Sequence, residues 1–103
     1  MSRPADDTLE RPGHIYFILV GDFIKIGWSS NFSKRIWHMR TAFPQEPKLI
    51  GILAGTQRQE RIVQRHFADC RARGEWFKRD QKLLAYIEER TEQGLWTCND
   101  WPE

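Results

Sequence analysis

Residues 15–28 read IYFILVGDFIKIGW, and this stretch decides how the rest of the chain can be organised. Its first six residues are apolar and rich in β-formers, which is typical of a well-buried strand. Gly21-Asp22 then supplies a tight turn, and the remaining residues return as a second strand. The stretch therefore predicts a β-hairpin. Tyr16, Ile18 and Val20 should share one face of it, because side chains alternate along a strand.

Downstream of the hairpin, periodicity and capping residues predict the other elements. Apolar residues at helical spacing predict a helix from Phe32 to about Thr41. The short apolar run at residues 48–55 predicts a third strand, and Thr56 with Gln59 fits a capping box that opens a second helix. Asp80 is expected to begin a third helix. The order β-β-α-β-α-α predicts an α+β domain built around a small sheet.

The size and composition of the chain fit one folded domain. It has 103 residues, of which 40% are hydrophobic and 29% charged. This length excludes a two-domain enzyme, and this hydrophobic content excludes a disordered chain. We expect a flexible N-terminal tail at residues 1–13, the domain at 14–93 and an acidic, Trp-containing extension at 94–103.

The charge is segregated along the chain. The net charge is only +2, but residues 23–82 hold 13 basic residues against five acidic ones, and both ends are acidic. A basic centre of this kind favours a phosphate-bearing partner, although an ordinary solvated surface would also account for it.

Cysteine content and hydropathy indicate the compartment. Cys70 and Cys98 are the only cysteines, and their spacing fits neither a zinc motif nor a disulfide framework. We expect Cys70 to be a small core residue. No apolar run approaches the length of a membrane span, and residues 1–7 have no signal-peptide core. An intracellular, cytoplasmic protein with no membrane partner is therefore predicted.

Three polar residues stand at positions that need an explanation. Lys25 lies inside an apolar hairpin, so it either snorkels from a wet face or has a functional role. Arg35 flanks the apolar stripe of the first helix, with His38 on the same flank. An ordinary solvated helix face would also account for a charged residue there. Glu60 falls at the margin of the buried arc of the second helix. Stabilisation of the helix dipole explains a glutamate there, and so does a divalent-metal site.

Taken together, Ile15-Tyr16, Lys25-Ile26-Gly27, Arg35 and Glu60 resemble the motifs of the GIY-YIG nuclease superfamily. Lys25-Ile26-Gly27 and the Gly-Glu-Trp-Phe signature at residues 74–77 resemble a phage- and bacteria-borne branch of it. The resemblance covers roughly residues 14–87. It implies a small three-stranded antiparallel sheet flanked by helices.

The resemblance also implies an activity, which is metal-dependent endonucleolytic cleavage of nucleic acid, with DNA the expected substrate. Tyr16 would assist or act as a base toward the attacking water, and Lys25 beside it would lower its pKa. Arg35 would neutralise charge on the phosphate, and Glu60 would bind Mg²⁺ or Mn²⁺. His38 stands one residue from the position where many family members have a histidine.

Other residues are expected around this site. Glu75 is left with two roles: a structural pairing with an arginine such as Arg73, or a second acidic group at the site. The residues predicted to bind nucleic acid share a positive charge and lie on the two helices next to the site: Lys34, Arg40, Arg58, Arg61 and Arg65.

Two alternative functions stay open. The first is an inactive or weakly active nucleic-acid-binding module that keeps the fold, because Met39 stands where many family members have a histidine and the family's asparagine has no clear match. The second is an interaction role for the Trp-rich segment at residues 95–101. The sequence leaves open DNA against RNA as substrate, and it leaves open whether a homodimer forms.

Overall fold

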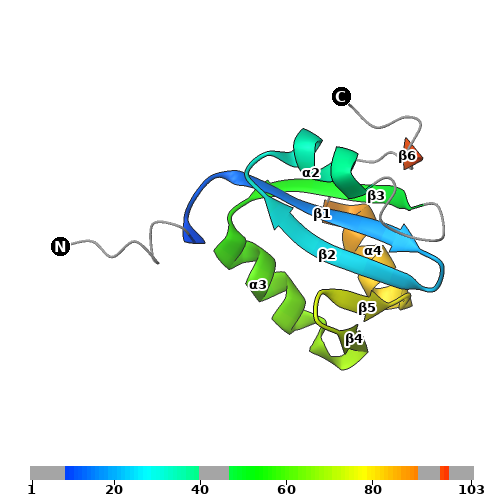
Figure 1. Cartoon of the computed structure of the whole chain (residues 1–103). Helices are drawn as coiled ribbons and strands as arrows, with labels where there is room; N and C mark the ends of the chain where they lie inside the picture. The colour runs from blue at the N-terminus through cyan, green and yellow to red at the C-terminus, as the bar shows by residue number, and fades with distance from the viewer. Residues whose placement is uncertain (1–8, 40–46, 91–95, 98–103) are drawn as a thin grey trace.

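The computed structural model describes residues 9–39, 47–90 and 96–97, and it shows one sheet with helices around it (Figure 1). The β-β-α-β-α-α order of the predicted elements is confirmed, with short elements added between and after them. The elements in chain order are β1 (Gly13–Val20), β2 (Phe23–Ser29), α2 (Phe32–Met39), β3 (Lys48–Gly55), α3 (Gln57–His66), the 3₁₀ helix η1 (Ala68–Cys70), β4 (Arg71–Arg73), β5 (Trp76–Lys78), α4 (Gln81–Arg90) and β6 (Trp96–Thr97).

The sheet has six strands in the order β4-β5-β2-β1-β3-β6, and each pair of neighbours is antiparallel. The sheet therefore has more strands than the three that the sequence predicted. The predicted three, β2-β1-β3, form the centre of the sheet. The added strands are only two or three residues long, so they carry too few positions to show an alternating pattern.

The predicted hairpin is confirmed. β1 and β2 pair from Val20 opposite Phe23 to His14 opposite Ser29. Gly21 has φ 61°, a left-handed conformation that glycine adopts without steric cost at a tight turn. Because β1 also pairs with β3 along its other edge, β1 is the central strand of the domain.

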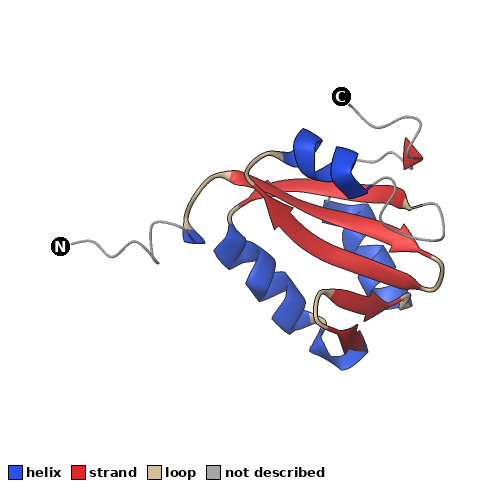
Figure 2. Ribbon diagram, in the orientation of Figure 1, coloured by secondary structure: helices blue, strands red, loops and turns tan. Residues whose placement is uncertain are grey.

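Alternation along the strands divides the core between the two faces of the sheet. Figure 2 shows the helices that lie around this sheet. On one face Ile15 and Phe17 belong to a large apolar cluster that includes residues of α3 and α4. On the other face Tyr16 and Ile18 form a smaller cluster with Met39 of α2. The predicted sharing of a face by Tyr16 and Ile18 is thus confirmed, and Tyr16 lies on the side that α2 covers.

Helix α3 is placed by its cap and by its apolar side. The predicted capping box is present, with Gln59 N donating to Thr56 Oγ1 and Thr56 N donating to Gln59 Oε1. Val63 and Phe67 pack into the larger cluster. The helix runs beside β2, as Figure 1 shows, and its buried Gln64 side chain meets the outer edge of that strand.

That edge of β2 is closed in two ways. β5 pairs with residues 23–25, and the backbone of Glu75 accepts a hydrogen bond from Ile26 N at 2.9 Å. The carbonyl oxygen of Ile26 accepts one from the buried side chain of Gln64, also at 2.9 Å. At Ile26 the edge of β2 thus bonds to the backbone that leads into β5 through its N–H and to a side chain of α3 through its carbonyl oxygen. Both elements are attached to β2 at this residue.

Some expectations end at the limits of the described residues. Helix α2 ends at Met39, and the predicted extension to Thr41 and the candidate Arg40 lie outside the described residues. Most of the acidic C-terminal extension also lies outside them.

Cys70 is buried as predicted, and Asp80 Oδ1 accepts a hydrogen bond from Lys82 N at the start of α4. None of the helices within the described ranges is long and apolar enough to cross a membrane.

Candidate active site

Tyr16 is held against Gly27, its partner across the hairpin. The tyrosine is 1% exposed, and a Cβ built on Gly27 would lie 2.5 Å from its hydroxyl oxygen. No side chain larger than hydrogen fits beneath the ring. Because the ring crosses over Gly27, the phenol is directed from β1 across β2, toward the edge of the sheet that α3 covers.

Replacing Gly27 with alanine should destabilise the fold by about 1–3 kcal/mol, because the new methyl group must push the Tyr16 ring out of its position. The free energy of unfolding, measured by chemical denaturation, checks this. In a Tyr16→Ala background the same change should cost much less, since the ring is gone. An equal cost in both backgrounds would show that the ring does not require the glycine.

Lys25 is held by the turn between β4 and β5. Its Nζ lies 2.8 Å from Glu75 Oε1 and 5.5 Å from the centre of the Trp76 ring. Gly74, with φ 58°, makes the turn that returns the chain beside β2. The ion-pair partner of Glu75 is therefore Lys25, and no salt bridge within the described residues joins Glu75 to Arg73, the partner named for a structural pairing. The expectation that Lys25 lies in a partly wet position agrees with its 19% exposed side chain.

Arg35 and His38 come from α2, which begins immediately after β2. Asn31 Oδ1 accepts from Lys34 N at 3.2 Å, and Ser29 Oγ accepts from Asn31 N at 3.0 Å, so the start of the helix is tied to the end of the strand. A cleft of about 440 Å³ opens there, lined by Ser29, Ser30, Asn31, Lys34, Arg35, His38 and Met39. The structure thus brings three predicted residues, Lys34, Arg35 and His38, to one cleft.

Glu60 is the buried carboxylate of the site. It is 4% exposed, and its Oε2 accepts a hydrogen bond of 3.2 Å from Gln64 Nε2. Burial, and after it the negative charge of nearby Glu75, raise its pKa from 4.5 to about 7, while Arg61 and Lys25 act in the opposite direction. Stabilisation of the helix dipole does not itself account for the burial of this carboxylate, because charged side chains are rarely buried.

The pKa of Tyr16 is also shifted by burial and by nearby charges. Its burial raises its pKa to about 12, while the positive charge of Arg35 lowers it and the charges of Glu75 and Glu60 raise it. The expectation that Lys25 would lower this pKa was wrong, because the ammonium is engaged by Glu75 and burial outweighs the nearby positive charge. Tyr16 is therefore a neutral phenol near pH 7, able to donate a hydrogen bond.

Three charged groups, Arg35, Glu60 and Glu75, lie close enough to Tyr16 to influence its pKa. Tyr16 comes from β1, Arg35 from α2, Glu60 from α3 and Glu75 from the β4–β5 turn. The sequence identified all four. The sequence gave no signal for Gln64. Its side-chain amide has a role only because it donates a hydrogen bond to the Ile26 carbonyl oxygen of β2, which none of the described strands pairs.

The carboxylates at the candidate site can be compared with what a divalent cation requires of its ligands. Among the described residues there is no group of three or more His, Cys, Asp or Glu side chains that could hold a metal ion. Hard cations such as Mg²⁺ bind through one or two carboxylates, with substrate phosphates and water completing the shell. Glu60 meets that requirement, since Gln64 orients its carboxylate, and Glu75 is the second acid nearby.

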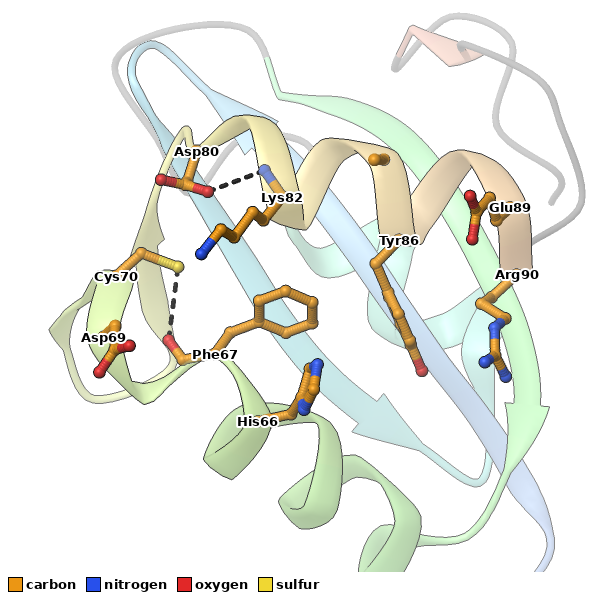
Figure 3. Close-up of a pocket in the computed structure, with 10 residues that line it drawn as sticks. His66, Phe67, Asp69, Cys70, Asp80, Lys82, Tyr86, Glu89 and Arg90 are labelled. Atoms are coloured by element: carbon orange, nitrogen blue, oxygen red, sulfur yellow. Dashed lines mark hydrogen bonds between the residues drawn. The ribbon is translucent and has the colours of Figure 1, made fainter.

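A larger cavity than the cleft beside Arg35 lies elsewhere, between the end of α3 and α4 (Figure 3). It has a volume of about 540 Å³, and the rings of His66, Phe67 and Tyr86 face it. Asp80 and Lys82 stand at one end of it, as the close-up shows. Tyr16, Arg35 and Glu60 are not among the residues that line it, so size alone does not locate the candidate site.

Comparison with known proteins identifies the family. No curated protein and no solved structure gives a match. The model of one family, the T5orf172 domain, matches residues 13–93, which is most of the chain. This finding overturns the resemblance to the GIY-YIG superfamily, whose motifs are too short here to separate one family from another. The chain belongs to the T5orf172 domain family.

Proposed function

We propose that this protein is a metal-dependent endonuclease that hydrolyses phosphodiester bonds of nucleic acid, and that DNA is its substrate. The observation that carries the proposal is Glu60, a buried carboxylate in a basic segment, grouped with a neutral tyrosine and an arginine. The T5orf172 domain is a phage-associated domain found in nuclease-like proteins, which supports this class of activity.

The reaction adds water across a phosphodiester. A water oxygen forms a bond to phosphorus, the bond to the leaving oxygen breaks, and the leaving oxygen takes up a proton. A divalent cation bound by Glu60 would act as a Lewis acid on the phosphate. Gln64 Nε2 holds one oxygen of that carboxylate, so its orientation is fixed before substrate binds.

The chain's own residues supply the other requirements. Arg35 lines an open cleft, where its guanidinium can bind the phosphate and stabilise the charge that develops on its oxygens. Tyr16 stays protonated near neutral pH, so its hydroxyl positions the attacking water and does not serve as a phenolate base. Lys25 is anchored to Glu75, where it limits the negative charge that surrounds Glu60.

Cleavage assays on duplex DNA, single-stranded DNA and RNA test the proposal, each with Mg²⁺, with Mn²⁺ and with EDTA. We expect cleavage of DNA with either cation and none with EDTA. Arg35→Gln should lower the rate about 100-fold or more, since one preorganised charge is lost at the phosphate. Arg79→Gln removes an exposed arginine outside the site and should cleave at the wild-type rate.

A second candidate function is binding of nucleic acid without turnover. The observation that favours it is the Lys25–Glu75 ion pair, which leaves Glu60 as the one carboxylate among the described site residues that is not paired with a cation. This candidate predicts salt-dependent binding and no cleavage with any divalent cation. Cleavage that Arg35→Gln abolishes would exclude it.

A further inference from the structure

The outer side of α3 carries a cleft that the proposed reaction does not use. Arg58, Arg61 and Arg65 recur at helical spacing on this side, and Arg71 joins them from β4. The cleft has a volume of about 460 Å³. We call it the arginine cleft, and its lining residues are Leu9, Arg58, Arg61, Gln64, Arg65 and Arg71.

Most of the positive charge in the arginine cleft has no acidic ion-pair partner among the residues that the structure describes. Arg58 forms an ion pair with Glu10. Within the described residues, Arg61, Arg65 and Arg71 form no salt bridge with an acidic side chain. Gathering like charges in one cleft raises the local potential, which favours an anion that can contact several guanidinium groups together.

Arg71 is held in place by neutral groups. Its Nε donates to Gly74 O at 2.7 Å and its Nη2 donates to Gln64 Oε1 at 3.1 Å. Its guanidinium also lies 5.3 Å from the centre of the Phe77 ring. Carbonyl and amide oxygens position the guanidinium but leave its charge intact. An arginine fixed in this way is already ordered for an anion and loses little entropy on binding one.

Gln64 joins the arginine cleft to the candidate active site. This side chain is 8% exposed and accepts from Arg71 on one side. On the other side its Nε2 donates to Glu60 Oε2 and to Ile26 O. One buried amide therefore separates the cleft from the carboxylate, so a polyanion in the cleft would also pass close to Glu60.

We propose that the arginine cleft binds a backbone phosphate of the same nucleic acid whose phosphodiester is placed between Arg35 and Glu60. This inference rests on the proposed function. It adds a second phosphate contact outside the reacting group and assigns it to Arg61, Arg65 and Arg71. The scissile phosphate and the flanking one would then lie on the two sides of Glu60.

Binding measurements in EDTA test the inference without any turnover. The dissociation constant of a fluorescent DNA duplex is measured against salt for the wild type and for two double variants of equal charge. Arg61→Gln/Arg65→Gln should bind about tenfold more weakly, with a salt slope reduced by about one to two. Arg73→Gln/Arg79→Gln removes two exposed arginines outside the cleft and should match the wild type.

Thermal melts of both double variants check that each is folded as stably as the wild type. Equal salt slopes in the two double variants would overturn the inference. So would displacement of the DNA by polyglutamate of equal charge as readily as by unlabelled DNA, because a phosphate site must prefer phosphate. Absence of cleavage with wild-type binding intact would count against the proposed function and not against the arginine cleft.

Discussion

Glu60→Gln should lower metal-dependent cleavage about 10³-fold while the affinity for DNA in EDTA stays close to that of the wild type. The substitution keeps the shape of the side chain, and an amide oxygen can still accept the hydrogen bond from Gln64. It removes the charge that a divalent cation requires. Loss of about 4 kcal/mol of transition-state stabilisation corresponds to this factor.

The measurement is the single-turnover rate with Mg²⁺ and with Mn²⁺, beside the matched variant Glu89→Gln, which removes an exposed glutamate on α4. We expect Glu89→Gln to cleave at the wild-type rate. If Glu60→Gln cleaved as fast as the wild type, the metal would have to be held elsewhere and the assignment of Glu60 would be wrong.

The second large effect concerns stability in the absence of metal. Because the pKa of Glu60 is about 7 in the folded protein against an ordinary 4.5, the folded state binds more protons than the unfolded state between these values. The protonated carboxyl stabilises the fold fully below the lower value. That contribution is lost as the pH rises through about 7, and it amounts to about 2–3 kcal/mol.

Glu60→Gln isolates this contribution, since the amide does not titrate. The free energy of unfolding should be measured for both proteins in EDTA from about pH 4 to about pH 8. Between the two ends of that range, the free energy of unfolding of the variant should rise by about 2–3 kcal/mol relative to that of the wild type. The other titrating groups are the same in both proteins, so their effects cancel in the difference. A difference that is independent of pH would show that the carboxyl has an ordinary pKa.

The parts of the fold that the sequence predicts correctly are specified by neighbouring residues. The hairpin follows from two apolar runs around Gly21, and the second helix follows from its capping box at Thr56 and Gln59. In each case the residues that carry the signal are close together in the sequence and contact one another. Local patterns of this kind are independent of what the rest of the chain does.

The edges of the sheet could not be predicted in this way. The hairpin of β4 and β5 exists because it pairs with β2, a segment about 50 residues earlier, and Arg71, Ala72 and Arg73 of β4 are all exposed. An exposed strand of three residues has no apolar face to reveal it. The same limit applies to Gln64, whose role depends on a carbonyl that β5 leaves unpaired.

The electrostatics of the candidate site could not be predicted from the sequence. Arg35 and Glu60 lie near enough to Tyr16 to influence its pKa, but that pKa is raised where a lowered value was expected. Desolvation depends on the packing around the ring, which the sequence does not contain. The ion pair of Lys25 with Glu75 joins residues whose proximity only the β4–β5 turn creates.

The central position of β1 has a consequence for motion within the site. Its backbone is hydrogen-bonded to β2 on one side and to β3 on the other, so Tyr16 can leave its place only when the whole sheet opens. Glu60 is held as well, through Gln64 and the packing of α3 into the larger core, whereas Arg35 belongs to α2, which can shift while the sheet stays closed. In hydrogen exchange the amide of Tyr16 should report global unfolding, with those of α2 exchanging through smaller openings. Tyr16 and Glu60 are thus the fixed points of the site, and adjustment to a substrate falls to Arg35.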